Sequence, residues 1–324
     1  MEDFCMAKPT IIAIEEHYAD PELTKHFPPG AQPGVLGPIG KKIQDLTDVR
    51  IKEMDEAGID IQVLSHGAPA TQRLDASVAV DLARLVNDRL HQTCQAHPTR
   101  FAGFAALPTA DPKASADELE RTVTKLGFKG AMIHGLSQGR FLDEKDFWPI
   151  FERAQALDVP IYMHPAAPDA TVVERYYKEY TKSFPAILNA GWGFTVETAT
   201  QTVRLVLSGV FEAYPKLKII VGHLGEGIPF LLWRIDQAMS RPENAGLSFR
   251  DLFCKHFWIT TSGNFSDPAL LCSVQELGAD RILFAVDWPF VANKPAVEWM
   301  NRVPLCTEDR VKILGGNAKR LLRM

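Results

Sequence analysis

Short apolar runs recur along the chain, and most of them end in a polar or charged residue. Runs of this length, rich in β-branched residues and lacking strict alternation, are typical of strands buried on both faces of a parallel sheet. We therefore expect eight strands. They cover Ile11–His17, Ile61–His66, Phe101–Ala106, Gly130–His134, Val159–Pro165, Leu217–His223, Phe257–Thr261 and Arg281–Asp287.

Segments with the apolar period of a helix separate these runs. We expect helices at Thr47–Ala57, Ala76–Ala96, Ala114–Lys125, Phe147–Leu157 and Thr195–Ala213. Strands that alternate with helices predict a parallel sheet, and eight such units in one chain of 324 residues favour a closed (β/α)8 TIM barrel. The alternative is an open doubly wound sheet. It is disfavoured because the chain has neither G-x-G-x-x-G nor G-x-x-x-x-G-K-[ST].

Two long segments interrupt the alternation. The first lies near 19–46, and its prolines and glycines make Ala19–Gln44 too irregular for a helix. The second lies near 166–194. No shift in composition marks a linker, so we expect a single barrel domain over 1–324 with two loop insertions. Long loops in compact domains are commonly functional.

Composition narrows the class of partner. Hydrophobic residues at 46% and charged residues at 23% are ordinary for a soluble globular protein. A net charge of -5 without a Lys/Arg cluster argues against nucleic acid. We also expect a cytoplasmic protein without membrane contact, because no signal peptide or bilayer-length apolar run is present. The five cysteines show no C-x-x-C spacing, so any metal ligands must be histidines and carboxylates.

The polar strand ends are where chemistry is expected, because a barrel carries its catalytic residues at the carboxyl ends of its strands. Side chains alternate along a strand, so Glu15 and His17 project to one side and Glu16 to the other. Glu15 and His17 should meet His164 and Asp287, which end the fifth and eighth strands. Mixed imidazole and carboxylate groups suit Zn, Mn or Fe(II). A single divalent ion is the natural occupant.

His223 ends the sixth strand, and the nearby Glu226 is placed to accept from its imidazole and fix the tautomer. His223 is therefore a candidate base or substrate-orienting group. Taken singly, each of two residues could instead have a purely structural role, His164 as a cap at the end of a strand and Asp287 as a cap of a turn. Their shared position at strand ends favours a common site. His66 and His134 are candidates to line the pocket. Histidines expected on the surface are His26, His91, His97 and His256.

Five motifs together resemble a known family. They are Ile14-Glu15-Glu16-His17, Tyr162-Met163-His164-Pro165, Gly222–Pro229, Ile259–Asn264 and Val286–Phe290. Over nearly the whole length, the chain resembles the non-oxidative decarboxylase branch of the amidohydrolase superfamily. Within that branch it is most similar to the 2,6-dihydroxybenzoate (γ-resorcylate) and 2,3-dihydroxybenzoate decarboxylases, relatives of aminocarboxymuconate semialdehyde decarboxylase. Tyr18–Leu46 departs from the resorcylate enzymes, so the substrate within this group stays open.

The resemblance implies a mononuclear Zn or Mn site formed by Glu15, His17, His164 and Asp287, with Glu15 where other members have the first His of H-x-H. It implies decarboxylation of a 2-hydroxybenzoate-type phenolic acid such as 2,6- or 2,3-dihydroxybenzoate. We expect Asp287 to protonate the ring carbon and His223 to hold a substrate oxygen. Further contacts with the aromatic carboxylate substrate are expected from Phe290, Trp192, Phe194, Tyr18 and Arg234.

A metal-dependent hydrolase of an amide, lactone or C–C bond is the alternative, with Asp287 as base toward a metal-activated water. The ligand set alone does not separate the two reactions. The fourth strand ends in His134 rather than a lysine able to bridge a second metal, which speaks against hydrolysis. A binding protein on an inactive barrel is the third class, and it is disfavoured because every expected site position is filled.

The second insertion predicts self-association. Val173–Leu188 carries four aromatic residues, more than a monomer should expose. They are Tyr176, Tyr177, Tyr180 and Phe184. The family resemblance also implies a homodimer or homotetramer.

Overall fold

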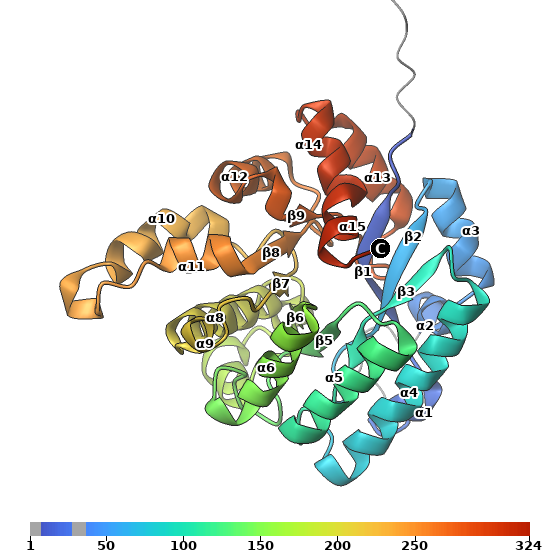
Figure 1. Ribbon diagram of the computed structural model, residues 1–324, viewed down its shortest axis with the longest axis horizontal. Helices are drawn as coiled ribbons and strands as arrows, with labels where there is room; N and C mark the ends of the chain where they lie inside the picture. Colours follow the sequence, from blue (N-terminus) through green and yellow to red (C-terminus); the bar gives the residue numbers. More distant parts are fainter. Residues whose placement is uncertain (1–7, 28–36) are drawn as a thin grey trace, which may run out of the picture.

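The computed structural model describes residues 8–27 and 37–324. All its strand pairings are parallel, in the orders β1-β2-β3 and β4-β5-β6-β7-β8-β9. Figure 1 shows the strands at the centre and the helices around them. The strands are β1 (Ile12–Tyr18), β2 (Ile61–His66), β3 (Phe101–Gly103), β4 (Ala105–Ala106), β5 (Ala131–His134), β6 (Ile161–His164), β7 (Ile219–Val221), β8 (Phe257–Thr260) and β9 (Ile282–Leu283).

Backbone hydrogen bonds join the two sheets at both of their edges. β3 and β4 are one predicted strand interrupted at Phe104, whose N–H donates to Leu64 O at 2.9 Å. At the other edge, Ile14 N donates to Phe284 O at 3.2 Å and His17 N to Trp288 O at 2.7 Å. The last strand segment therefore lies beside the first, as the predicted (β/α)8 barrel requires.

The helices begin and end where local chemistry dictates. The principal ones are α3 (Asp48–Ala57), α4 (Ala76–Ala96), α5 (Pro112–Leu126), α6 (Trp148–Leu157), α8 (Gly193–Leu207), α9 (Val210–Ala213), α10 (Ile228–Met239), α11 (Phe249–His256), α12 (Asp267–Leu277), α13 (Asn293–Arg302), α14 (Thr307–Val311) and α15 (Asn317–Leu321). Asp111 caps α5 by accepting from Ala114 N at 2.9 Å. The predicted helix Thr195–Ala213 is two helices, because Gly209 takes a left-handed φ of 85° between them.

The insertions contain more regular structure than expected. The first holds α1 (Pro21–Thr24) and α2 (Gly37–Gln44), so the expectation of no helix over Ala19–Gln44 was wrong. Part of that stretch, 28–36, lies outside the described residues. The second holds α7 (Ala170–Val172), a π-helical turn η2 (Val173–Tyr177) and a 3-10 turn η3 (Pro185–Leu188).

Apolar side chains fill the barrel and leave one end for the site. Ile12 and Ile14 of β1 belong to an interior cluster that continues into Ala318 and Leu321 of α15. α15 lies over the barrel centre near β1 in Figure 1, so it closes the end where the strands begin. Within the described residues, no helix is both long and apolar enough to cross a bilayer. That the barrel is the only domain over 1–324 stays a prediction.

Candidate active site

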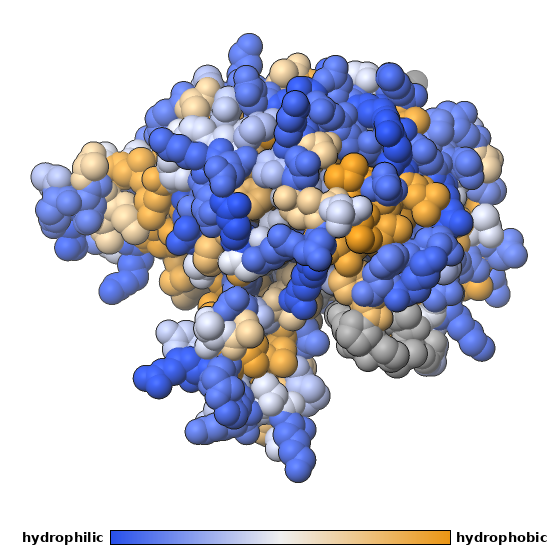
Figure 2. Space-filling view, turned by 90° about the horizontal axis from the view of Figure 1, so that it is seen from below, coloured by the Kyte–Doolittle hydropathy of each residue, from blue (hydrophilic) through white to orange (hydrophobic). Residues whose placement is uncertain are grey.

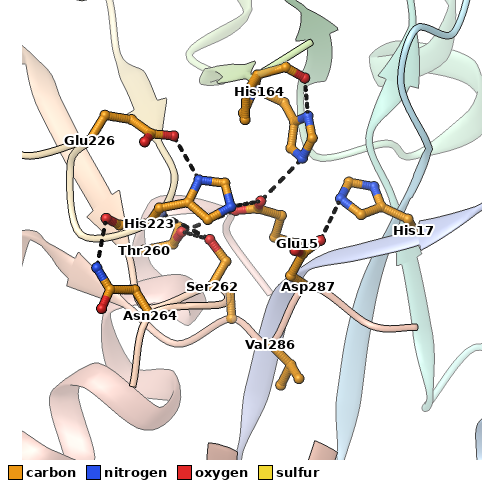
Figure 3. A network of polar contacts seen from close by, with 12 residues as sticks. Glu15, His17, His164, His223, Glu226, Thr260, Ser262, Asn264, Val286 and Asp287 are labelled. Carbon is orange, nitrogen blue, oxygen red and sulfur yellow. Dashed lines mark hydrogen bonds and ion pairs between the residues drawn. The ribbon is translucent and has the colours of Figure 1, made fainter. Parts of the chain in front are cut away.

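Four side chains from separate parts of the chain meet where the strands end. Glu15 and His17 come from β1, His164 ends β6, and Asp287 follows β9. One candidate ligand atom from each lies within 4.8 Å of the others. His17 Nε2 is 3.2 Å from Asp287 Oδ1, and His164 Nε2 is 3.3 Å from Glu15 Oε1. The convergence predicted from the strand ends is therefore confirmed (Figure 3).

The cluster fits a single divalent ion. Among the described residues, Glu15 Oε1 and His17 Nε2 are fully buried and have no hydrogen-bond partner, which is costly unless another group satisfies them. Ligand atoms bound at about 2.0–2.2 Å to one ion stand roughly 3 Å apart. The separations of 3.2 and 3.3 Å match this spacing. One Glu, two His and one Asp are also the mixed nitrogen and oxygen set that Zn or Mn accepts.

Neighbouring groups orient these side chains. The far ring nitrogen of His17 lies 3.2 Å from Ser65 Oγ, and that of His164 lies 2.7 Å from Pro165 O. Both contacts leave Nε2 facing the centre, as the outer hydrogen bond of a metal-binding histidine does. The remaining oxygen of Glu15 accepts from two hydroxyl groups inside the barrel. They belong to Tyr162 and Thr260.

His223 and Glu226 form the predicted pair beside the cluster. His223 Nδ1 lies 2.7 Å from Glu226 Oε1, and its Nε2 lies 3.5 Å from Glu15 Oε1. Both paired residues, and Leu224 between them, have a left-handed backbone with φ of 51–57°. Strain of this kind persists only where the surroundings hold it, and here Ser262 Oγ accepts from His223 N at 3.0 Å. Burial lowers the pKa of His223, but Glu226 and Glu15 outweigh it and raise the value to about 10.

The two carboxyl groups of the cluster differ electrostatically. Burial acts to raise the pKa of Glu15, but His223, His164 and His17 together lower it to about 2. Burial and the charge of Glu15 raise the pKa of Asp287 to about 7. Burial also lowers the pKa of His17 to about 4. Without a bound ion, Glu15 is therefore the stronger acid of the pair, and Asp287 holds a proton more readily.

A cavity of about 180 Å³, partly open to solvent, adjoins the cluster. Its lining residues are Ala68, His164, Asn189, Ala190, Phe194, His223, Asp287 and Phe290. The Phe290 ring lies 5.9 Å from the His17 ring, which places an aromatic wall beside the candidate ligands. Phe194 and Phe290 were among the predicted substrate contacts. Ala68, Asn189 and Ala190 were not, because loop residues without a charge or motif leave no sequence signal.

Other predicted contacts do not line this cavity within the described chain. Tyr18 is buried, and its hydroxyl donates to Val86 O of α4 at 3.4 Å, away from the cavity. Trp192 is 55% exposed at the start of α8. Arg234 is exposed on α10, which projects from the barrel in Figure 1.

The remaining histidines occupy varied places. His134 is buried, with Nδ1 2.9 Å from His164 Nδ1, so it supports a candidate ligand. His66 is buried and accepts from Asp20 N at 3.0 Å. The surface assignment of His256 was wrong: it is 2% exposed and stacks on Phe211 with ring centroids 4.3 Å apart. His26 is exposed, and His91 and His97 are half-buried.

Comparison with known proteins agrees with this geometry. Residues 24–324 match the family model described as Amidohydrolase. The γ-resorcylate decarboxylase of Polaromonas sp. (strain JS666) is 41% identical, over 97% of this chain and 98% of the relative. The γ-resorcylate decarboxylase of Rhodococcus jostii (strain RHA1) is 40% identical, over 97% of this chain and 98% of the relative. The chain belongs to the amidohydrolase family, a class defined here by a metal-binding cluster at the mouth of an α/β barrel.

Solved structures narrow this class. A 2,6-dihydroxybenzoate decarboxylase complexed with 2,6-dihydroxybenzoate is similar with a TM-score of 0.87 and 38% identity, over 98% of this chain and all of that one. A dihydroxybenzoic acid decarboxylase from Polaromonas sp. JS666, with bound manganese and the inhibitor 2-nitroresorcinol, is similar with a TM-score of 0.88 and 39% identity. The match covers 98% of this chain and 97% of that one. The chain is accordingly a metal-dependent carboxy-lyase, as the motifs implied.

Proposed function

We propose that this enzyme releases CO2 from a 2-hydroxybenzoate-type phenolic acid, such as 2,6- or 2,3-dihydroxybenzoate. The observation that carries the proposal is the joining of an aromatic-walled cavity to the four-residue cluster, with Asp287 in both. Relatives that match nearly the full chain are named for decarboxylation of such acids, which supports the same reaction here.

Glu15, His17, His164 and Asp287 would hold one Zn or Mn ion. Such an ion, when bound, supplies positive charge that neutralises the carboxylate and phenolate oxygens of the substrate. The protein supplies the shape around that charge. Phe290 and Phe194 present apolar surface to the ring, which the mostly apolar lining of the cavity suits.

His223 would hold a substrate oxygen. Its Nδ1 is engaged by Glu226 at 2.7 Å, so the Nε2–H is the group left to donate toward the cavity. Burial lowers the pKa of His223, but in the metal-free protein Glu226 and Glu15 raise it to about 10, which favours the charged form of this donor. A charged donor binds a carboxylate or phenolate more strongly than a neutral one.

Asp287 would deliver the proton. Its carboxyl group lies in the cavity wall between His17 and the ring site. The proton bonds to the ring carbon that carries the carboxylate, which interrupts the aromatic system. The carbon–carbon bond then breaks, its electron pair restores the ring, and the carboxylate leaves as CO2. Asp287 regains a proton from water before the next turnover.

The test is a panel of hydroxybenzoates assayed for CO2 release with Mn²⁺-loaded enzyme, with the reaction repeated in D2O. We expect one deuterium at the ring carbon that lost its carboxylate. The hydrolase alternative predicts turnover of amides or lactones instead. No CO2 from the hydroxybenzoates together with hydrolysis of that second panel would overturn the proposal.

Metal dependence gives a separate test. We expect elemental analysis to find about one Zn or Mn per chain and a chelator to abolish CO2 release, because the cluster offers a single set of converging ligands. Protein without stoichiometric metal whose activity resists chelation would contradict this assignment.

We also propose a homodimer or homotetramer. On the second insertion Tyr176, Tyr180 and Phe184 are 68%, 51% and 66% exposed, whereas Tyr177 is buried. A second apolar surface lies on α10, where Phe230 and Trp233 are 82% and 70% exposed. Figure 2 shows apolar patches on the projecting part of the molecule that contains α10, at the left of the view. Exposed aromatic side chains grouped in this way are typical of a protein–protein interface.

A further inference from the structure

Glu16 points away from the metal cluster and is completely buried. Its Oε1 accepts from Val286 N at 2.9 Å, and its Oε2 accepts from Trp288 N at 3.2 Å. Between these two, Asp287 N donates to Glu15 O at 2.9 Å. Three consecutive N–H groups, centred on Asp287, therefore all bind to the adjacent residues Glu15 and Glu16.

The backbone at Asp287 requires such support. Asp287 has a φ of 75°, a left-handed conformation that is strained for a non-glycine residue. The regular part of the last strand ends at Leu283, so no continuous ladder holds this stretch. At the barrel seam, where the segment after β9 meets β1, separate backbone hydrogen bonds take the place of a ladder. They run from Ile14 N to Phe284 O, from Asp287 N to Glu15 O and from His17 N to Trp288 O. The carboxyl group of Glu16 replaces the missing ladder bonds.

Arg50 secures this arrangement from behind. Its Nη2 donates to His17 O at 2.5 Å, its Nη1 donates to Gln62 Oε1 at 3.2 Å, and its guanidinium lies 4.0 Å from the centre of the Trp288 ring. Arg50 is fully buried. It therefore ties the strand that carries His17 to the segment on the far side of Asp287.

Hydrogen-bond donors surround both carboxyl oxygens of Glu16. Its oxygens meet only donors, from Val286 N, Trp288 N and the Gln62 side chain at 3.4 Å. An amide NH2 group in the place of either oxygen would face an N–H and leave it without an acceptor.

We propose that Glu16, supported by Arg50, is a positioning residue that holds Asp287 in its left-handed conformation and so aims the Asp287 carboxyl group at His17 and the cavity. The inference rests on the proposed function, in which Asp287 donates the proton. Glu16 itself touches neither the cavity nor the cluster of candidate ligands. It acts through the backbone of its neighbour across the barrel seam.

The central test is Glu16→Gln, which keeps the size of the side chain but sets an NH2 group against a backbone N–H. At saturating Mn²⁺ we expect kcat to fall about 10- to 100-fold with KM changed less than about threefold, because substrate binding is retained while proton delivery is misaligned. The affinity for Mn²⁺, measured by titration of the metal-free protein, should also weaken about 10-fold, since Asp287 is one of four candidate ligands.

Glu118→Gln is the matched control. Glu118 is another buried carboxylate, held by Arg121 and Asn87 on α5 and α4, remote from the cluster. Both variants should lower the unfolding midpoint, because each replaces a buried hydrogen-bond acceptor with an NH2 group. Only Glu16→Gln should lower kcat and Mn²⁺ affinity. A kcat within twofold of wild type in folded Glu16→Gln protein would overturn the proposal.

A double variant separates positioning from general damage. In an Asp287→Asn background, Glu16→Gln should cost less than about twofold further in kcat, because the group it positions no longer donates. Independent losses that multiply would overturn the proposal. If Glu16→Gln does not fold, Arg50→Lys keeps the charge but loses the fork of hydrogen bonds, and we expect kcat to fall about 3- to 10-fold. An unchanged kcat in that variant would equally overturn it.

CO2 release by the wild type is measured first, so that two failures remain distinct. Absence of release from every hydroxybenzoate contradicts the proposed function, and the Mn²⁺ titration of Glu16→Gln then still tests the positioning role. Release by the wild type with unchanged kcat and Mn²⁺ affinity in the variant contradicts the positioning role alone.

Discussion

Asp287 has a central role in the proposed reaction, because it belongs both to the candidate ligands and to the cavity wall. Asp287→Asn keeps the shape of the side chain but removes its acidic proton. We expect the fold and substrate binding to persist while kcat falls by about 10² to 10⁴, the range typical of losing a general acid. Steady-state CO2 release with metal-loaded protein measures this.

Metal content must be determined beside the Asp287→Asn kinetics, since an amide is a weaker ligand than a carboxylate. A variant that carries one ion per chain and keeps nearly wild-type kcat would remove Asp287 from the role of proton donor. That outcome would leave the decarboxylation itself untouched.

His66 gives a pH prediction outside the cluster. Its Nε2 accepts from Asp20 N at 3.0 Å and its Nδ1 lies 2.9 Å from Gly67 O, so the folded protein holds it neutral. Burial lowers the pKa of His66 from 6.5 to about 4. The unfolded chain therefore binds more protons between these values. The stability from neutral His66 is full above pH 6.5 and is lost as pH falls toward 4, by at most ~3 kcal/mol.

Urea unfolding of metal-free protein between pH 4 and 7 measures this dependence. In His66→Gln the free energy of unfolding should be lower at pH 7 but should fall less steeply with acid, because one titrating group is gone. Identical slopes in wild type and variant would show that His66 is not the group that responds.

At the scale of elements, the strands and most helices could be predicted because buried parallel strands and amphipathic helices leave periodic apolar patterns. The same logic placed Glu15, His17, His164 and Asp287 together, since parallel strands end at one face. Contacts that depend on tertiary packing leave no such pattern. Examples are the bond from Tyr162 to Glu15, the buried face of His256 and the α2 helix in a glycine-rich stretch.

The element that joins the second insertion to the barrel is the start of α8. A Cβ on Gly193 would lie 2.8 Å from Ile187 O and 2.8 Å from Pro168 Cγ. Gly193→Ala should therefore displace the loop that brings Asn189 and Phe194 to the cavity. We expect KM to rise about 3- to 10-fold, with a smaller change in kcat, because binding surface is lost while the cluster is not.

Gly316→Ala is the control for that displacement, since its Cβ would meet nothing nearer than 3.5 Å. It should leave KM unchanged. Equal KM values for Gly193→Ala and wild type would show that the start of α8 does not set the position of the loop.

At the scale of the whole molecule, the exposed aromatic surface predicts self-association. Light scattering at micromolar concentration should give the mass of a dimer or tetramer. Phe230→Ser and Trp233→Ser, combined, should weaken the assembly if the α10 surface is the interface, because each removes an exposed apolar side chain that association would bury. Lys52→Ser, at an exposed position of α3 outside both apolar surfaces, is a control that should not. A wild-type monomer would contradict the prediction.

The barrel seam also dictates a sequence of events in time. Glu16 and Val286, which bond across it, are separated by 270 positions in the chain. At a synthesis rate of about 5–20 residues per second, the segment around Val286 is made roughly 15–50 s after β1. Throughout that interval one edge of β1 has no partner. Neither the hydrogen bonds from Glu16 to the segment around Asp287 nor the cluster of candidate ligands can form. A nascent chain therefore cannot complete its catalytic centre gradually, and any chain released before the last strand is made lacks both Asp287 and the segment that pairs with β1.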